Sequence, residues 1–236
     1  MHTDLQYVKK ITTFFLHQEP EITNPNMPLF IVHPVLETRV AYLTSENRMF
    51  DIFDEPDTYK KWLEEIEDTI NSATTLSRLV RFIRKPYLLG YFKYVCDALS
   101  EEDFAETLGD IWCDTETPSD ETNASHKDKV LWFKKANKKH LMTEEEYNTF
   151  LMLPDKLMLY RGCRMQEKKH GMSWTLNKDK AEWFARRYEI LEASPVIYIV
   201  EINKNQVLAY FNRRDEDEIV IDSHRLNKEE IKEVRL

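Results

Sequence analysis

The stretch that decides the fold is LMLYRGCRMQEKKHGMSWTLNKDKAEWFA, residues 157–185. It opens with a short apolar run over residues 157–160, and a second run follows over residues 172–176. Each run has the length of a buried strand. Residues 178–188 then repeat apolar side chains at helical spacing, which places four of them on one side: Ala181, Phe184, Ala185 and Tyr188. The stretch therefore predicts two strands followed by a helix.

More strands are predicted downstream of this helix. Residues 196–202 are rich in β-branched side chains and indicate a strong strand. Shorter apolar runs over residues 207–211 and 219–221 complete the set. We therefore expect residues 153–236 to form a β-rich core.

Upstream of this core, apolar residues recur at spacings of three and four, which is typical of helices. Thr143 and Glu146 make a capping box, which predicts a helix over residues 144–152. Residues 1–152 are therefore expected to be mainly helical, with short strands near residues 29–43. The chain as a whole is expected to be an α+β protein.

The composition excludes several classes of protein. Of the 236 residues, 33 are Lys or Arg and 42 are Asp or Glu, and the net charge of −9 argues against a general nucleic-acid-coating protein. With four glycines, the chain contains neither a Gly-rich dinucleotide fingerprint nor a P-loop. Its three cysteines form no C-x-x-C pair, so neither a disulfide framework nor a zinc site is supported. No signal peptide and no run of roughly 18 apolar residues is found, so we expect a cytoplasmic protein.

Two segments of the predicted core carry functional groups on short strands. Arg161 lies at the end of the first apolar run, and a guanidinium can bind a phosphate through two parallel hydrogen bonds. Ser173 and Thr175 lie in the second run, and residues two apart on a strand point to the same face. Their two hydroxyls could therefore orient a ligand or a carboxylate together.

A third segment, the acidic run DEDE at residues 215–218, leads into the last predicted strand. On an extended strand, Glu216 and Glu218 share one face, and Asp215 and Asp217 share the other. Three interpretations are open. The run is a solvated acidic turn, or a divalent-metal site, since clustered carboxylates suit Mg²⁺ or Ca²⁺. Alternatively, it is a glycosyl-transfer site in which one carboxylate stabilises an oxocarbenium-like centre and the other handles a proton.

In this order, a Tyr-Arg, a Ser-x-Thr and a Glu-x-Glu resemble the R-S-E class of mono-ADP-ribosyltransferases, which bind and cleave NAD. The resemblance covers roughly residues 155–222. The Gly-x-Ser-Trp-Thr segment and the Ala-x-x-Phe-Ala that follows it are also similar to a group of phage- and bacterium-encoded transferase-like proteins. The resemblance implies a split β-sandwich transferase core, which the helical front half would cover or regulate. Arg161 and Ser173 are 12 positions apart, closer than is usual in the family.

The resemblance also implies roles for individual residues. Arg161 would bind the phosphates of NAD, which is a substrate here. Ser173 would position the nicotinamide ribose and Glu218. Glu218 would bind the ribose 2′-OH and stabilise the positive charge that develops as nicotinamide leaves, and Glu216 would activate the acceptor. The other residues implied at the NAD site flank these motifs: Tyr160, Gly162, Thr175 as support for its strand, and Trp174, which either stacks on a ring of NAD or belongs to the core.

The loop before the glutamates would contact the acceptor through Phe211, Asn212, Arg213 and Arg214. The resemblance implies a toxin or effector that transfers ADP-ribose to a protein or a nucleic acid inside a cell. An antitoxin or other inhibitor protein is a further partner that it suggests. It implies neither a metal ion nor a membrane partner.

Two other functions fit the same residues. A metal-dependent phosphodiesterase built on residues 215–218 would need Mg²⁺ or Mn²⁺ and would be indifferent to NAD. A catalytically inactive binding module of a toxin-antitoxin or phage-related system would keep the core, and its helical half would engage a partner. In that case the substitution Glu218→Gln would change no phenotype.

Overall fold

The computed structural model describes residues 2–118, 123–163, 171–187, 194–227 and 229–236. The chain divides into two compact units, Met1–Asp103 and Phe104–Leu236. We call these the first unit and the second unit and describe each by itself. Both contain helices and strands, so the prediction of an α+β protein is confirmed.

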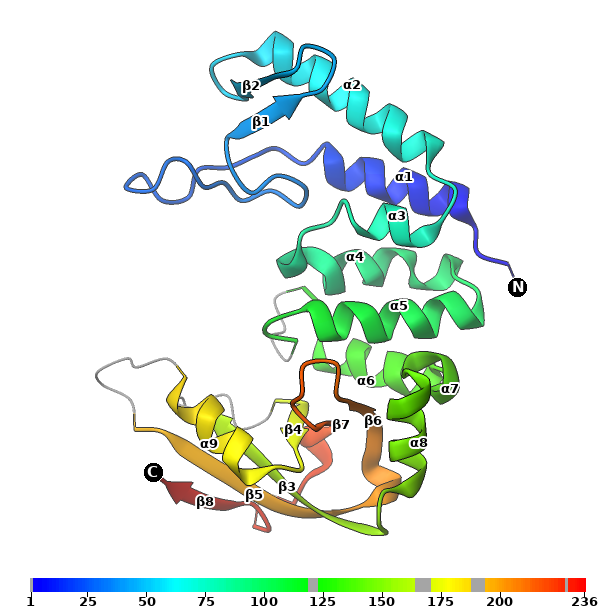
Figure 1. Ribbon diagram of the computed structural model, residues 1–236, viewed down its shortest axis with the longest axis vertical. Helices are drawn as coiled ribbons and strands as arrows, with labels where there is room; N and C mark the ends of the chain where they lie inside the picture. Colours follow the sequence, from blue (N-terminus) through cyan, green and yellow to red (C-terminus); the bar gives the residue numbers. More distant parts are fainter. Residues whose placement is uncertain (1, 119–122, 164–170, 188–193, 228) are drawn as a thin grey trace. The chain divides into compact units, whose positions relative to one another are not determined.

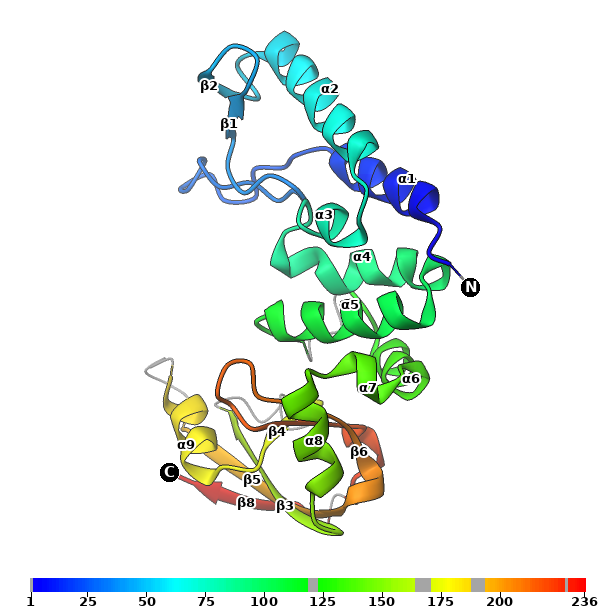
Figure 2. The same ribbon diagram turned by 45° about the vertical axis from the view of Figure 1, so that its right-hand side comes forward.

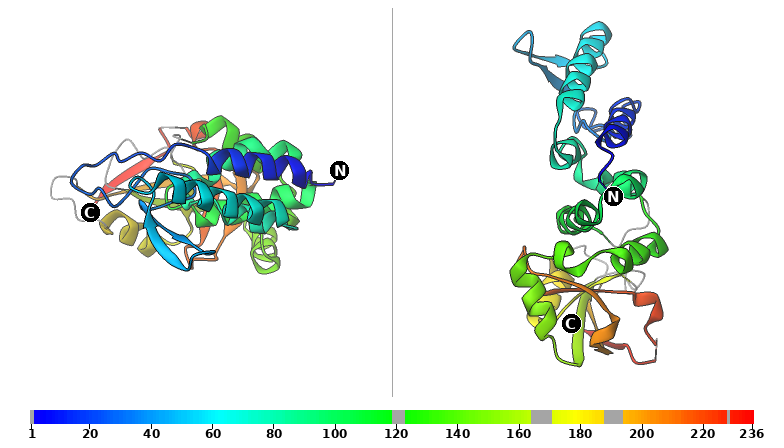
Figure 3. Two further views of the ribbon diagram at one scale, coloured as in Figure 1. Left: turned by 90° about the horizontal axis from the view of Figure 1, so that it is seen from above. Right: turned by 90° about the vertical axis from the view of Figure 1, so that its right-hand side faces the viewer.

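The first unit is mainly helical. Helix α1 begins at Asp4, whose carboxylate accepts a hydrogen bond from the backbone N–H of Tyr7. Helices α1 and α2 lie side by side (Figures 1 and 3). The elements of the unit are α1 (Leu5–Leu16), β1 (Val40–Leu43), β2 (Arg48–Asp51), α2 (Pro56–Ser72), α3 (Leu76–Val80), η1 (Lys85–Tyr87), α4 (Leu88–Val95) and η2 (Cys96–Ala98). Their buried side chains, among them Val8, Leu16, Ile70, Leu79 and Phe92, form its core.

Of the extended segments predicted near residues 29–43, only the second is a strand, β1, which pairs with β2 as an antiparallel hairpin. Residues 29–32 take part in isolated bridges instead. Pro28 and Pro34 flank this segment, and proline lacks the N–H that a strand ladder requires.

The second unit combines helices with a six-stranded sheet. Its helices are α5 (Glu101–Asp114), which starts just before the unit boundary, α6 (His126–Lys135), α7 (Lys138–Leu141), α8 (Glu144–Met152) and α9 (Lys178–Arg186). Its strands are β3 (Lys156–Cys163), β4 (Ser173–Thr175), β5 (Val196–Asn203), β6 (Val207–Phe211), β7 (Glu218–Ile221) and β8 (Lys232–Arg235), with short 3₁₀ turns η4 (Lys204–Gln206) and η5 (Ser223–Arg225). Helix α8 begins with the predicted capping box, so that prediction is confirmed.

The sheet has the strand order β6-β7-β4-β3-β5-β8, and every neighbouring pair is antiparallel. Strands β3 and β5 pair along eight residues, from Lys156 opposite Asn203 to Cys163 opposite Val196. Strands β3 and β4 share a single register pair, Tyr160 opposite Thr175. The sheet therefore consists of two three-stranded groups, β6-β7-β4 and β3-β5-β8, that are joined at one point.

Helix α9 lies against strands β3 and β5 (Figures 1 and 2). The closest approach is at Gly162, where a Cβ atom would lie 1.7 Å from the backbone oxygen of Ala181 and 2.8 Å from the backbone nitrogen of Ala185. A side chain at position 162 would therefore overlap the helix. Gly162 was predicted at the NAD site. In the structure, the absence of a side chain at position 162 allows α9 to pack closely on β3.

Helices α5 to α8 belong to the same compact unit as the sheet, so the predicted division at residue 152 differs from the observed one. The reason is their shared core. The rings of Trp112 in α5 and Phe133 in α6 meet edge to face at 4.8 Å, and the Phe133 ring lies 6.4 Å from that of Phe211 in β6. Amphipathic helix periodicity shows that a helix has a buried face, but it does not show which element covers that face.

Among the described residues, no helix is both long enough and apolar enough to span a bilayer.

Candidate functional site

The three predicted motifs lie on three neighbouring strands of the second unit. Arg161 is on β3, Ser173 is on β4 and Glu218 is the first residue of β7. Thr175 of β4 pairs with Tyr160 on one side and with Glu218 on the other. Arg161 and Ser173 are 57 and 45 positions from Glu218 along the chain, and the fold brings all three onto consecutive strands of one sheet.

Ser173 and Glu218 lie on the same face of the β4–β7 pair. Ser173 is opposite Val220, and Glu218 is opposite Thr175, so the serine and the glutamate are diagonal neighbours. Within the described part of the chain, the buried Ser173 hydroxyl oxygen has no partner in hydrogen-bonding geometry. It is still close enough to the carboxylate to lower the pKa of Glu218. A small approach by the freely rotating hydroxyl would complete a Ser173–Glu218 hydrogen bond.

Glu218 is a buried carboxylate, with 5% of its surface exposed. Burial raises the pKa of Glu218 because it disfavours the charged form, and the nearby Ser173 hydroxyl and the hydrogen bond from the Trp112 side chain oppose this rise. The nearby Arg214 also lowers the pKa, whereas Glu216 raises it. The net pKa of Glu218 lies above its ordinary value. A carboxylate that is kept in a low-polarity site but bound by donors is suited to stabilise a positive charge in a ligand.

This burial predicts a pH-dependent gain in stability for Glu218→Gln. Because the folded-state pKa is raised, the wild-type protein loses stability as pH rises from the unfolded-state pKa through the folded-state pKa. The uncharged variant lacks this loss, so we expect it to be more stable at pH 8 by an amount on the order of 1 kcal/mol, and the difference to shrink at pH 4. Urea unfolding of both proteins at the two pH values measures this. A variant that is less stable than the wild type at pH 8 would contradict it.

The hydrogen bond from Trp112 was not predicted. The indole Nε1 donates to Glu218 Oε1 at 3.0 Å, and the two residues are 106 positions apart. No local pattern in the sequence indicates the partner of Trp112. The only available signal was chemical, since a buried tryptophan needs an acceptor for its single N–H.

Arg161 is directed toward β4. Its Nη1 donates to the backbone oxygen of Ser173, and its guanidinium lies against Gly171, where a Cβ atom would be 2.1 Å from Nη2. Burial lowers the pKa of Arg161, and the charge of Glu218 acts in the opposite direction. A guanidinium stays charged in a protein even so. The structure therefore places a half-buried positive charge beside the strand that carries Ser173.

The residues that flank these motifs have structural contacts. Trp174 is buried, and its Nε1 donates to the backbone oxygen of Gly171 at 3.0 Å, which corresponds to the core alternative for this residue. The Thr175 hydroxyl donates to the backbone oxygen of Glu216 at 2.7 Å and accepts from the N–H of Asn177 at 3.0 Å. Thr175 thus connects β4 to the turn before β7 and to the start of α9.

Residues 215–217 do not continue the strand, so the alternation of faces that holds for an extended run does not apply to them. Strand β7 begins at Glu218, and the backbone is left-handed at Asp215 (φ 55°) and at Asp217 (φ 46°). Aspartate tolerates this conformation better than most residues with a side chain. Glu216 therefore lies in a turn, and simple alternation does not place it on the same face as Glu218. Its carboxylate pairs with Arg214 at 2.9 Å.

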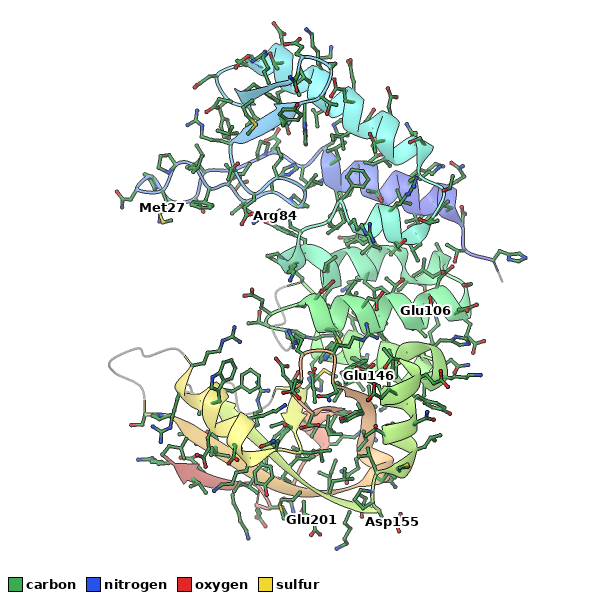
Figure 4. The ribbon with its side chains drawn as sticks, in the orientation of Figure 1. Met27, Arg84, Glu106, Glu146, Asp155 and Glu201 are labelled. Atoms are coloured by element: carbon green, nitrogen blue, oxygen red, sulfur yellow. The ribbon has the colours of Figure 1, made fainter. Side chains whose placement is uncertain are left out.

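The predicted acceptor loop is also shorter than expected. Phe211 is the last residue of β6 and only 1% exposed, so its placement on the loop is wrong. The loop begins at Asn212, whose N–H donates to Glu146 at 2.8 Å, and Arg213 pairs with Glu146 and with Asp110. Figure 4 labels Glu146 in the first turn of α8, and its carboxylate holds the start of the loop through these contacts. Arg214 is the more exposed arginine of the two.

The four acidic residues of this segment are held by three different side chains. Lys180 of α9 pairs with Asp215 at 3.0 Å and with Asp217 at 3.8 Å, whereas Glu216 pairs with Arg214 and Glu218 binds Trp112. No three of these carboxylates converge as metal ligands in the part of the chain that the structure describes. Their arrangement therefore gives no support to a metal-dependent phosphodiesterase.

Comparisons with known proteins found no family model, no curated protein and no solved structure that matches this chain.

Proposed function

We propose that this protein is an NAD-dependent mono-ADP-ribosyltransferase. The observation that supports this most directly is the adjacency of Ser173 and Glu218 on β4 and β7, with the Arg161 guanidinium bound to the backbone of Ser173. This set supplies a cation for the phosphates, a hydroxyl for the ribose and a carboxylate for the developing positive charge. In this proposal the single register pair between β3 and β4 is the point at which a split β-sandwich divides.

The buried Ser173 hydroxyl is consistent with a ribose ligand. Buried polar groups usually have a hydrogen-bond partner, and an unpaired one costs free energy. Ser173 Oγ has no partner in the described part of the chain, and it lies beside Glu218. A ribose hydroxyl bound between Ser173 and Glu218 would give the serine hydroxyl a hydrogen-bond partner. Its contact with Glu218 would fix the orientation of the ribose.

The reaction follows from these positions. Arg161 binds the phosphates of NAD, and ionised Glu218 binds the ribose 2′-OH. The bond between ribose C1′ and the nicotinamide nitrogen breaks, its electron pair stays with nicotinamide, and Glu218 stabilises the oxocarbenium-like centre that remains. A lone pair of the acceptor then forms a bond to C1′, and the proton that the acceptor loses passes to Glu216. Nicotinamide leaves as a neutral molecule.

The acceptor in this proposal is a protein or a nucleic acid, and the chain acts as a toxin or effector inside a cell. An antitoxin or other inhibitor protein would bind it and block its activity. Arg214 on the loop before Glu216 offers local positive charge to an anionic acceptor despite the net charge of −9.

The test uses NAD labelled in its ADP-ribose part, incubated with the protein and cell lysate, with and without EDTA. We expect label on protein or nucleic acid and free nicotinamide in both conditions. Hydrolysis of phosphodiesters that EDTA abolishes, with no use of NAD, would favour the phosphodiesterase. Absence of both label and nicotinamide release in every lysate would favour the inactive binding module.

Arg161→Lys tests the phosphate-binding part of the site. A lysine ammonium keeps the charge but cannot form the two parallel bonds of a guanidinium, so we expect the KM for NAD to rise about 10-fold or more. Steady-state nicotinamide release measures it, and circular dichroism verifies the fold. The matched control is Arg78→Lys at an exposed position of α3, which should leave the KM unchanged. An unchanged KM for Arg161→Lys would contradict the assignment.

A further inference from the structure

The Trp112 side chain contacts the carboxylate on which the proposed reaction depends, although it comes from a helix outside the predicted core. Its indole N–H donates to Glu218 Oε1 at 3.0 Å. We propose that Trp112 is a positioning residue for this reaction, which holds one oxygen of Glu218 so that the carboxylate faces the nicotinamide ribose. This inference rests on the proposed function.

The first argument is the chemistry of the two groups. An indole has one donor and no acceptor, and a buried donor that finds no partner costs free energy. Trp112 is completely buried, and the acceptor that it uses is a side chain with a formal charge. Hydrogen bonds to an ionised group are stronger than those between neutral groups. The contact therefore restricts the rotamers of both side chains.

The second argument is the rigidity of the tryptophan. Its ring packs edge to face on Phe133, with ring centroids 4.8 Å apart and an interplanar angle of 88°. Helix α5 also approaches α7 closely, because a Cβ atom at Gly109 would lie 2.2 Å from the backbone oxygen of Leu141. A tryptophan that is fixed by packing on a regular helix gives a preorganised donor.

The third argument is the capacity of the carboxylate. An ionised carboxylate has two oxygens and about four acceptor positions. Trp112 binds one oxygen from the side of α5, and Ser173 approaches from β4. The carboxylate of Glu218 can therefore still accept a hydrogen bond from the ribose 2′-OH. Because Trp112 and Ser173 occupy two sides of the carboxylate, the ribose must approach it from the remaining side.

The charge of Glu218 depends on the same contact. Groups from each neighbouring element act on it: Trp112 and Cys113 from α5, Ser173 from β4, Arg161 from β3, and Arg214 and Glu216 from the turn before β7. Burial raises the pKa of Glu218, and the indole N–H counteracts that rise. Loss of this donor should therefore raise the pKa further and reduce the ionised fraction at low pH.

The experiment compares wild type with Trp112→Phe, which keeps an aromatic ring and removes the N–H. We expect kcat for nicotinamide release to fall about 10-fold or more, with little change in the KM for NAD, and the acidic limb of the pH profile to move to higher pH. The matched control is Trp62→Phe, a buried tryptophan of α2 in the first unit, which should leave both kcat and the pH profile unchanged.

A second measurement does not depend on the folding of a Trp112 variant. The indole N–H resonance of Trp112 in the wild-type protein should shift with pH as Glu218 titrates, and this shift should vanish in Glu218→Gln. An indole resonance that does not titrate would overturn the inference.

The two proposals fail in different ways. If the wild-type protein is active, Glu218→Gln is inactive and Trp112→Phe keeps the wild-type kcat and acidic limb, the positioning role is overturned and the proposed function stands. If the wild-type protein neither releases nicotinamide nor transfers label, the proposed function fails, and the positioning role fails with it.

Discussion

Glu218→Gln is expected to lower kcat for ADP-ribose transfer by about 1,000-fold. The amide keeps the size of the side chain and an oxygen that can still accept from Trp112, but it removes the negative charge. Because that charge stabilises only the oxocarbenium-like centre of the proposed reaction, its loss should affect kcat much more than the KM for NAD. Nicotinamide release and label transfer under saturating NAD measure the effect.

The control for this substitution is Glu201→Gln. Glu201 lies on β5 of the same sheet, is exposed and pairs with Lys156 at 2.8 Å. Strands β4 and β3 lie between β5 and β7, and Figure 4 labels Glu201 at the lower edge of the view. Surface ion pairs contribute little, so this variant should retain full activity and stability. If both variants kept the wild-type kcat, Glu218 would have no role in the chemical step.

Gly162→Ala is expected to destabilise the protein by about 3 kcal/mol. The added Cβ would lie 1.7 Å from the backbone oxygen of Ala181, so helix α9 must move away from β3 or the strand must bend. Backbone atoms cannot avoid the methyl group by changing a rotamer, which makes the cost larger than for an ordinary surface alanine. The free energy of unfolding from urea titration measures it.

Met158→Ala is the matched control on the same strand and the same face as Gly162. The Met158 side chain is 44% exposed, and its truncation should change the free energy of unfolding by about 0.5 kcal/mol or less. Wild-type stability of Gly162→Ala would show that α9 does not pack on β3 as described here.

Local features were predictable from the sequence. The capping box at Thr143 and Glu146 depends on residues three positions apart, and the structure confirms both the box and the helix that it starts. Strands β3, β5 and β6 also follow from their apolar runs, since most of the apolar side chains of these strands are buried within the second unit. The resemblance to R-S-E transferases rests on motifs of this local kind.

Features that depend on tertiary contacts were not predictable. The resemblance placed Phe211 on the acceptor loop, yet its ring is packed near Phe133 of a distant helix. The alternation of side chains through residues 215–218 fails because Asp217 adopts a left-handed conformation, stabilised by contacts of its carboxylate with Lys180 and Tyr210. Trp112 is the clearest case, because its partner lies 106 positions away. Short-range patterns carry no information on such pairs.

The distance along the chain between Trp112 and Glu218 has a consequence for biosynthesis. Ribosomes make α5 before β7, so the helix and its tryptophan emerge while the strand that they contact has not yet been translated. Pairings between such distant segments fold slowly, because the intervening chain must be closed into a loop first. The complete site can therefore form only after β7 has been translated, and a nascent chain that ends before β7 carries no assembled site.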